Sequence, residues 1–249
     1  MKAIIVAAGA GSRLVPHTNG MPKCLLHIGG QTILQRALGA LRINGVSDIA
    51  VVKGYCGHMI DYRDVTYYDN TDFSNNNILR SLFYAEDEMT DDFIFSYSDI
   101  LYSGDVVAGL VKNEGDVVLT VDANWKQAYE GRHMHPISEA ELVKVEDGLV
   151  KRIGKDVVVP GEAYGEFIGL AKFTKSGAET MKSTYHRIAK SCSGQPFQHA
   201  ISLEKAYLTD MIQELIDHGV SVHSYDISGG WMEIETPQDL DRARTLDRG

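Results

Sequence analysis

Short apolar runs alternate with amphipathic stretches through the first half of the chain. Residues 3–7 are a continuous apolar run, which is typical of a strand buried on both faces. Residues 31–44 space Ile33, Leu34, Ala37, Leu38 and Leu41 at helical intervals. The same patterns predict strands over 48–53, 65–68, 93–95 and 117–121 and a further helix over 78–89. Strands that alternate with helices indicate an α/β fold with a doubly wound, mostly parallel sheet.

The second half of the chain has a different pattern. Residues 140–145 and 149–153 flank Asp147-Gly148, a dipeptide that favours a β-hairpin. Further strands are predicted over 164–173, 220–225 and 231–235, with a helix from Leu208 to a stop at Gly219 and another from Pro237. Because no linker or repeat interrupts residues 1–249, we predict one domain with a β-rich insertion that forms a pocket wall.

The composition excludes several classes of protein. The 249 residues are 44% hydrophobic and 23% charged, which is typical of a globular chain. A formal net charge of −10 argues against a general nucleic-acid or membrane-surface binder. Cys24, Cys56 and Cys192 are odd in number and widely spaced, which favours a reducing compartment. With no apolar run near the ~18 residues of a membrane span and too short a run at 1–7 for a signal peptide, we expect a cytoplasmic protein.

A glycine-rich loop follows the first predicted strand. Gly9 and Gly11 allow a sharp turn and a close approach of the backbone to a ligand. A dinucleotide-binding fingerprint is disfavoured, because Leu14 stands where a third glycine or alanine is needed and Pro16 and Pro22 break the helix that must follow. A P-loop would need Gly-Lys-Ser/Thr, which is missing. A turn without a ligand stays open as an alternative.

The whole stretch AAGAGSRLVPHTNGMPK (residues 7–23) gives a third interpretation. It resembles the N-terminal signature of the nucleotidyltransferase superfamily, which is a hydrophobic strand, then AAGxGxR, a spacer and PK. The resemblance implies a Rossmann-like nucleotidyltransferase fold in which the loop cradles the phosphates of a nucleoside triphosphate. It also implies that Lys23 and Arg13 are catalytic and stabilise the transition state at the α-phosphorus.

The same resemblance implies a magnesium site. The superfamily places an aspartate after a central strand, usually as Gly-Asp, and here Ser98-Asp99 follows the strand predicted at 93–95. It places a second acidic ligand near the C-terminus, where Glu233 and Glu235 are the candidates. Residues at i and i+2 of a strand face the same side, so both could point into one site. Asp99 as a helix N-cap, and the two glutamates as solvated strand residues, are the alternatives.

Within the superfamily the chain is most similar to cytidylyltransferases that act on phosphocholine or small phosphonates. The similarity lies in PKCLLHIGGQTIL (22–34), Gly54-Tyr55, NNNILRSL (75–82) and YGEFIGL (164–170). Asparagine amides carry both donors and acceptors, as reading a pyrimidine edge requires, although asparagine runs are also common in turns. The nucleotide-binding residues implied are Ala7, Ala8, Gly9, Ala10, Gly11, Ser12, Gly54, Tyr55, Asn76, Asn77, Ser81 and Ser98.

Four residues are candidates for binding the acceptor: Arg132, Tyr129, Lys155 and Glu166. Arginine suits bidentate contact with a phosphoryl group, so we assign Arg132 to the phosphonate, with a solvated surface charge as the alternative. Glu166 is assigned to a hydroxyl or amine of the acceptor, with an exposed strand carboxylate as the alternative. The pair His133 and His135 is without a third metal ligand at suitable spacing, so it is expected in a surface loop.

The predicted reaction is attack of a phosphonate or phosphate oxygen of the acceptor on the α-phosphorus of CTP, with release of pyrophosphate. A phosphoryl dianion is nucleophilic near neutral pH, so no general base is required. The expected partners are CTP, Mg²⁺ and a small phosphonate or phosphomonoester, with no nucleic acid or membrane, and a homodimer is compatible with the sequence. A sugar- or polyol-phosphate nucleotidyltransferase, a non-catalytic nucleotide-sensing module and, disfavoured, a dinucleotide oxidoreductase are the alternatives.

Overall fold

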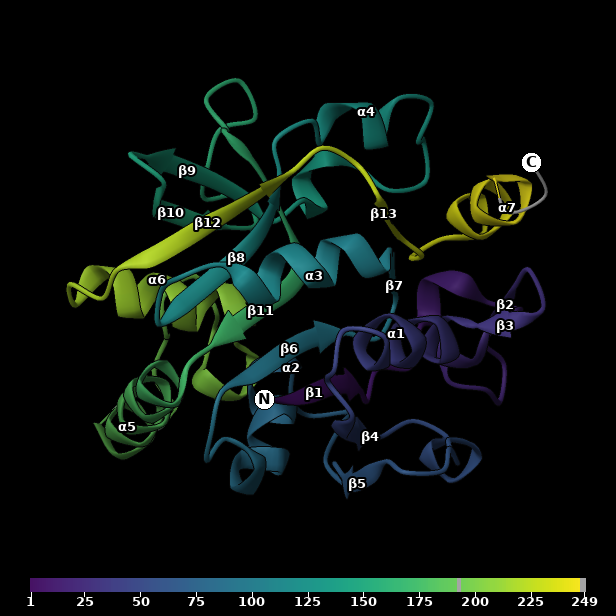
Figure 1. Cartoon of the computed structure of the whole chain (residues 1–249), viewed down its shortest axis with the longest axis horizontal. Coiled ribbons are helices and arrows are strands. Elements are labelled where there is room, and N and C mark those ends of the chain that lie inside the picture. Colours follow the sequence, from purple (N-terminus) through teal and green to yellow (C-terminus); the bar gives the residue numbers. More distant parts are fainter. Residues whose placement is uncertain (192–193, 247–249) are drawn as a thin grey trace.

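The fold is known from a computed structural model, which describes residues 1–191 and 194–246. Cys192 therefore lies outside the described residues. In the described part a nine-stranded sheet runs through the molecule in the order β5-β4-β1-β6-β11-β8-β12-β10-β9 (Figure 1). Its strands are β1 (Lys2–Ala7), β4 (Asp48–Lys53), β5 (Thr66–Asp69), β6 (Phe93–Tyr97), β8 (Val117–Asp122), β9 (Leu142–Glu146), β10 (Leu149–Gly154), β11 (Gly165–Phe173) and β12 (Val222–Ile227).

The sheet is mixed. Strands β5, β4, β1 and β6 are parallel, as the alternation of strands and helices predicts. Strand β11 is antiparallel to both β6 and β8, while β8 and β12 are parallel. The reason lies in the connection, because the chain leaves β8 at Asp122 and returns at Glu166, which is the register partner of Asp122. A strand that starts where its neighbour ends must run back along it. The Rossmann-like α/β fold is confirmed, with its parallel region at the N-terminal half of the sheet.

Helices cover both faces of the sheet. Helices α1 (Ile33–Arg42) and α3 (Gly104–Lys112) pack on one face, and α2 (Ile78–Leu82), α5 (Lys175–Ser191) and α6 (Leu208–Asp217) pack on the other. Alternate residues of β1 enter different cores, since Ile5 packs with the α1 side and Ile4 and Val6 with the α2 side. This two-sided burial accounts for the continuous apolar run at the start of the chain.

Two predicted helices differ in detail from the observed ones. Helix α1 begins at Ile33 because Thr32 caps it in a capping box with Gln35, and residues 31–32 instead form β3 (Gln31–Thr32), which pairs with β2 (His27–Ile28). The helix predicted over 78–89 is α2 followed by a 3₁₀ segment at Phe83–Glu88, with a kink at Ala85. Helices α3 and α5 were not predicted, since α3 is short and α5 is mostly polar.

The predicted hairpin is confirmed as β9 and β10. Asp147 and Gly148 both have positive φ, 51° and 74°, as a two-residue type I′ turn requires. The hairpin is continuous with the central sheet, because β10 pairs with β12 and β9 pairs with β11. It therefore lengthens the sheet and places the start of β9 and the end of β10 beside the carboxyl end of β8.

A second small sheet connects the C-terminal segment to the middle of the chain. Strand β13 (Trp231–Glu233) pairs antiparallel with β7 (Ile100–Tyr102), so that Glu233 is the register partner of Ile100. Helix α7 (Pro237–Leu246) follows at the edge of the molecule, beside the β2–β3 hairpin (Figure 1). Segments more than a hundred residues apart thus meet next to the end of β6.

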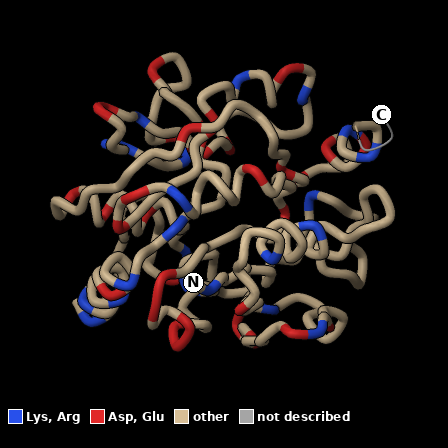
Figure 2. The backbone as a smooth tube through the Cα atoms, viewed as in Figure 1, with Lys and Arg blue, Asp and Glu red and all other residues tan. Residues whose placement is uncertain are grey.

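Basic and acidic residues are interspersed along most elements of the fold (Figure 2). An acidic cluster stands out at residues 86–92, which hold Glu86, Asp87, Glu88, Asp91 and Asp92 and no basic residue. Among the residues described, no helix has both the length and the apolar character needed to cross a membrane.

Candidate active site

A cavity of about 300 Å³ lies at the carboxyl ends of the parallel strands β1 and β6. This is the place where open α/β sheets bind ligands. Most of the predicted site residues line it, namely Ala7, Ala8, Gly9, Gly11, Ser12, Arg13, Lys23, Asn76, Asn77, Ser81, Ser98, Asp99, Lys155, Glu166, Glu233 and Glu235. Ala10, Gly54, Tyr55, Tyr129 and Arg132 do not line it. The structure thus brings together residues from both ends of the sequence.

The glycine loop leaves backbone donors unpaired beside the cavity. Among the described residues, the N–H groups of Gly9, Ala10 and Gly11 donate no hydrogen bond. Gly11 has a left-handed conformation with φ 60°, and its carbonyl accepts a hydrogen bond of 2.8 Å from the Thr18 hydroxyl. An added Cβ at Gly11 would lie 3.1 Å from the Cβ of Lys23, so glycine lets the lysine pack against the loop. Unpaired N–H groups beside a cation are suited to phosphate oxygens.

Gly54 and Tyr55 support this loop from behind. The Tyr55 N–H donates to the carbonyl of Ala8 at 3.1 Å, and the Tyr55 hydroxyl accepts from the Gly20 N–H at 3.1 Å. A Cβ on Gly54 would lie 2.6 Å from the carbonyl oxygen of Ala8, which is closer than atoms can pack. Both residues therefore hold the shape of the loop, and the cavity itself is lined by the loop's own residues.

Lys23 is the centre of the charged network in the cavity. Its Nζ lies 2.5 Å from Asp99 Oδ2 and also forms an ion pair with Glu235. Arg13 binds the other oxygen of Glu235 at 2.5 Å and reaches Glu139 at 3.2 Å. Burial alone would lower the pKa of Lys23, but the two carboxylates outweigh burial and raise it above its ordinary value. Lys23 is therefore a permanent cation, placed beside the glycine loop.

The β13–β7 pairing places the C-terminal carboxylates beside Asp99. The Ile234 N–H donates to the backbone carbonyl of Asp99 at 2.8 Å, so Glu233 and Glu235 lie on either side of that contact. Both side chains line the cavity, as their strand spacing predicts. Burial, followed by the charges of Glu235 and Asp99, raises the pKa of Glu233 to about 7. Three partly exposed carboxylates thus line the same cavity.

The chemistry of these carboxylates fits a hard divalent cation. Asp99 Oδ1 is buried and has no hydrogen-bond partner, and Asp99, Glu233 and Glu235 supply carboxylate oxygens, which Mg²⁺ prefers. The His135 imidazole lies 3.4 Å from Glu233 Oε2. Within residues 1–191 and 194–246, no three His, Cys, Asp or Glu side chains are gathered closely enough to form a complete metal site. The Lys23 ammonium lies between Asp99 and Glu235. These two carboxylates therefore face a positive charge both with and without a bound metal ion.

The asparagine amides are used within the protein. Asn76 exchanges two hydrogen bonds with Asn70, of 2.8 and 3.0 Å, and also accepts from Ser81. Asn77 caps α2 by accepting from the Ile78 N–H, and its amide nitrogen donates to the carbonyl of Lys205. Asn76, Asn77 and Ser81 therefore shape one wall of the cavity with side chains that are already paired within the protein.

The opposite wall carries a buried carboxylate with an unused oxygen. Glu166 Oε1 accepts a 2.7 Å hydrogen bond from the Tyr129 hydroxyl, while Oε2 is buried without a partner. Burial is the main cause that raises the pKa of Glu166 to about 8. Tyr129 lies behind Glu166, outside the cavity lining, and so acts on the cavity through this carboxylate. In the ionised form, this unpaired buried oxygen can accept a hydrogen bond from a ligand or face a cationic group of it.

Several residues of this wall were not predicted from the sequence. Glu141 is buried, accepts from the Tyr97 hydroxyl at 2.9 Å and from Thr209 at 3.3 Å, and has its pKa raised by burial. Lys155, which was predicted, pairs with Glu139 at 3.2 Å and lies 4.6 Å from the centre of the Tyr207 ring. The sequence offers one sign that Glu141 belongs to a site, which is its position as a charged residue at the start of the strand sequence ELVKV (141–145).

Arg132 has a different environment from the one predicted. Its side chain is 4% exposed and binds Asp239 and Glu233, so the guanidinium is engaged within the protein and does not line the cavity. Neither alternative from the sequence, a phosphonate ligand or a solvated surface charge, describes this arrangement. The two histidines lie in a loop as predicted, with His133 exposed, but the His135 side chain is buried. Burial lowers the pKa of His135 to about 4.

Comparison with known proteins agrees with this geometry. The sequence profile of the MobA-like NTP transferase domain matches residues 3–166. The chain is 29% identical to the CTP:phosphoglutamine cytidylyltransferase of Campylobacter jejuni subsp. jejuni, over 97% of this chain and 98% of that protein. It is 26% identical to the 2-aminoethylphosphonate cytidylyltransferase of Lancefieldella rimae, over 74% of this chain and 71% of that one. It shares a fold with the CTP:phosphocholine cytidylyltransferase of Streptococcus pneumoniae, with a TM-score of 0.74, 22% identity and 98% of each chain covered.

The support of the glycine loop leads to a prediction. Replacing Gly54 by alanine forces a Cβ against the backbone of Ala8, so we expect the free energy of unfolding to fall by about 1–3 kcal/mol and CTP to bind more weakly. Urea denaturation and calorimetric titration with CTP measure the two effects. Gly39→Ala is the matched control, because Gly39 is exposed within α1 and nothing lies near its Cβ position. Wild-type stability and CTP affinity in Gly54→Ala would contradict the assigned role.

Proposed function

The chain belongs to the family of MobA-like NTP transferase domains, and from this premise we propose that it is a cytidylyltransferase. It would transfer CMP from CTP to a small acceptor that carries a phosphate or phosphonate, and release pyrophosphate. The observation that carries the proposal is the cavity itself. It has the glycine loop with Lys23 and Arg13 at one end, and the unpaired oxygen of Glu166 on the opposite wall. The assignment of CTP is supported by the names of the relatives from Campylobacter jejuni and Lancefieldella rimae.

The glycine loop and its cations would bind the triphosphate. The N–H groups of Gly9, Ala10 and Gly11 are placed to donate to phosphate oxygens, and Lys23 and Arg13 supply positive charge beside them. Asp99, Glu233 and Glu235 would hold Mg²⁺, which when bound neutralises charge on the phosphate oxygens. Preorganised charge of this kind contributes most where charge develops in the transition state.

The chemistry proposed is a single in-line displacement. An oxygen of the acceptor's phosphate or phosphonate attacks the α-phosphorus of CTP and forms a new P–O bond. The bond from the α-phosphorus to the α–β bridging oxygen breaks, and pyrophosphate leaves with that electron pair. A phosphoryl group with a second pKa near 6 is largely dianionic at neutral pH, so the protein has to position and stabilise charge, without a general base.

The acceptor would lie between Lys155 and Glu166. Lys155 lines the cavity and is oriented by Glu139, which also binds Arg13, and by the Tyr207 ring, so we assign it to the acceptor's phosphate or phosphonate. Glu166 Oε2 would receive an amine, ammonium or other N–H group. Because Arg132 is engaged with Glu233 and Asp239, a phosphonate is no better supported than a phosphate, and the acceptor class becomes a phosphate or phosphonate with a cationic or donor group at its other end.

A coupled pyrophosphate assay tests this function. Four nucleoside triphosphates are combined with phosphocholine, 2-aminoethylphosphonate, phosphoglutamine, glucose 1-phosphate and inositol 1-phosphate, with Mg²⁺ or with excess EDTA. We expect the highest kcat/KM with CTP and one of the nitrogen-containing acceptors, and no turnover in EDTA. Preference for UTP or dTTP with a sugar phosphate would indicate the sugar-phosphate alternative. Nucleotide binding without pyrophosphate release from any pair would indicate a sensing module.

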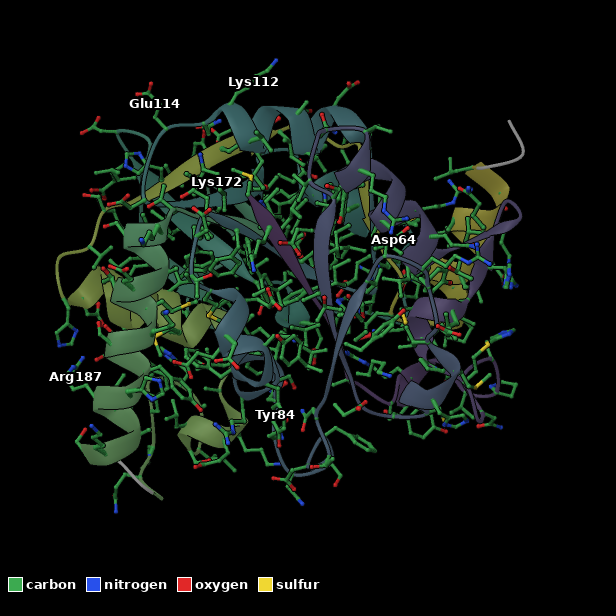
Figure 3. All side chains as sticks on the ribbon, turned by 60° about the horizontal axis from the view of Figure 1, so that its bottom comes forward. Asp64, Tyr84, Lys112, Glu114, Lys172 and Arg187 are labelled. Carbon is green, nitrogen blue, oxygen red and sulfur yellow. The ribbon has the colours of Figure 1, made fainter. Side chains whose placement is uncertain are left out.

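Lys23 gives a direct prediction for catalysis. In Lys23→Ala the cation beside the glycine loop is lost, so we expect kcat to fall by at least ~100-fold while the circular dichroism spectrum stays native. Lys112→Ala removes the same charge from the exposed end of α3, where the side chain projects from the surface (Figure 3), and should turn over as the wild type does. A folded Lys23→Ala protein with near-wild-type turnover would remove Lys23 from the mechanism.

Glu166 gives a prediction for pH dependence. Its pKa is raised to about 8, by burial and by Glu233 and Glu141, against the lowering effects of Tyr129 and Arg132. The ionised fraction would therefore rise from about a tenth at pH 7 to about nine tenths at pH 9. The quaternary ammonium of phosphocholine does not titrate, so its KM with wild-type protein should fall up to ~10-fold across this range.

The matching variants are Glu166→Gln and Glu162→Gln. Glu166→Gln should raise the KM for phosphocholine, abolish the pH dependence and leave the KM for CTP unchanged. Glu162→Gln makes the same chemical change at an exposed position that pairs with Lys144, and should behave as the wild type does. A pH profile that survives in Glu166→Gln would assign the titration to another group.

A further inference from the structure

Arg132 connects the two acidic residues of the C-terminal segment. Its Nε donates to Asp239 Oδ1 at 2.7 Å, and one terminal nitrogen donates both to Asp239 Oδ2 and to Glu233 Oε2 at 3.0 Å. The guanidinium also lies 5.3 Å from the centre of the Tyr129 ring, and the side chain is 4% exposed. One buried guanidinium therefore forms a bidentate ion pair with Asp239 and a third hydrogen bond to Glu233.

Asp239 in turn fixes the backbone of Glu235. Its Oδ2 accepts from the Glu235 N–H at 3.2 Å, the Thr236 N–H at 2.8 Å and the Thr236 hydroxyl at 2.8 Å. The Arg132–Asp239 pair thus acts on both cavity carboxylates, on the side chain of Glu233 and on the main chain of Glu235. Neither Arg132 nor Asp239 lines the cavity, so their effect on a ligand must pass through those two glutamates.

We propose that Arg132, with Asp239, is a positioning residue that fixes Glu233 and Glu235 for binding a divalent cation. This inference rests on the proposed function and deepens its metal site. Lysine cannot take over the role, since an ammonium is a point charge and cannot reproduce the fork on Asp239 while also reaching Glu233. Residues that orient metal ligands in this way commonly change metal affinity about 10- to 100-fold when replaced.

A second contact attaches the segment that carries Arg132 to α7. This contact provides a control, because it separates the attachment of the segment from the positioning of the glutamates. The Gln238 side chain accepts from the N–H groups of His133 and Met134, at 2.8 and 3.2 Å, and donates to the carbonyl of Gly131 at 2.7 Å. Gln238 joins the same segment to the same helix without contacting Glu233 or Glu235. Gln238→Ala therefore loosens the attachment of the segment and leaves the carboxylate contacts in place.

The test is a titration with Mn²⁺ alone, followed by the EPR signal of the unbound ion, on wild-type protein, Arg132→Lys and Gln238→Ala. We expect Arg132→Lys to weaken Mn²⁺ binding about 10- to 100-fold and to lower kcat, with the KM of the acceptor unchanged. Gln238→Ala should lower the melting temperature and keep Mn²⁺ affinity within about twofold of the wild type. If Arg132→Lys does not fold, Asp239→Asn carries the same expectation for Mn²⁺.

Distinct results overturn the inference and the function. Wild-type Mn²⁺ affinity in folded Arg132→Lys, together with a raised KM for the acceptor, would indicate that Arg132 binds the acceptor, as the sequence predicted. Equal losses of Mn²⁺ affinity in Arg132→Lys and Gln238→Ala would indicate that Arg132 only attaches its segment to α7. A wild-type protein that releases pyrophosphate but does not bind Mn²⁺ would overturn the positioning role alone. A wild-type protein that neither binds CTP nor releases pyrophosphate would overturn the proposed function and this inference with it.

Discussion

The ion pairs of Lys23 with Asp99 and Glu235 are the interaction on which the rest of the site depends. They join the loop after β1, the end of β6 and the segment after β13, three parts of the chain that only the fold brings together. Lys23 is buried and the two carboxylates are partly buried, so removing one partner would leave a poorly compensated charge beside the cavity. The same contact therefore joins three segments of the chain and sets the electrostatics of the cavity.

Helices pack on both faces of the sheet, and this packing explains how the residues of the Lys23 ion pairs are kept in position. Strands β1 and β6 are central and buried on both faces, which fixes the positions of their carboxyl ends. The glycine loop, Asp99 and the β13–β7 pair all extend from these ends. Flexible side chains such as Lys23 and Arg13 are thus attached to the most rigid part of the molecule, as preorganised charge requires.

The sequence allowed the first half of the sheet, the glycine loop, and the convergence of Lys23, Asp99 and the C-terminal glutamates to be predicted, because these follow from local patterns and from a long signature. The partners of Arg132 could not be predicted, since Asp239 is 107 residues away and pairs with it only through tertiary contacts. The asparagines gave no sign that Asn70 would pair with Asn76. The antiparallel direction of β11 depends on where the chain re-enters the sheet, and hydrophobic periodicity does not encode direction.

The single unpaired oxygen of Glu166 makes the cavity discriminate unevenly among molecules of similar size. In the proposed function, a molecule of the same shape with neither a donor nor a cationic group at that point would leave the ionised oxygen desolvated and unpaired, which is penalised in a buried site. An extra methylene elsewhere would change the fit by only about 1–3 kcal/mol. The proposed site should therefore reject acceptors of the same shape that lack the nitrogen far more strongly than acceptors that are longer by one methylene. Change of substrate during evolution would then begin at this one carboxylate.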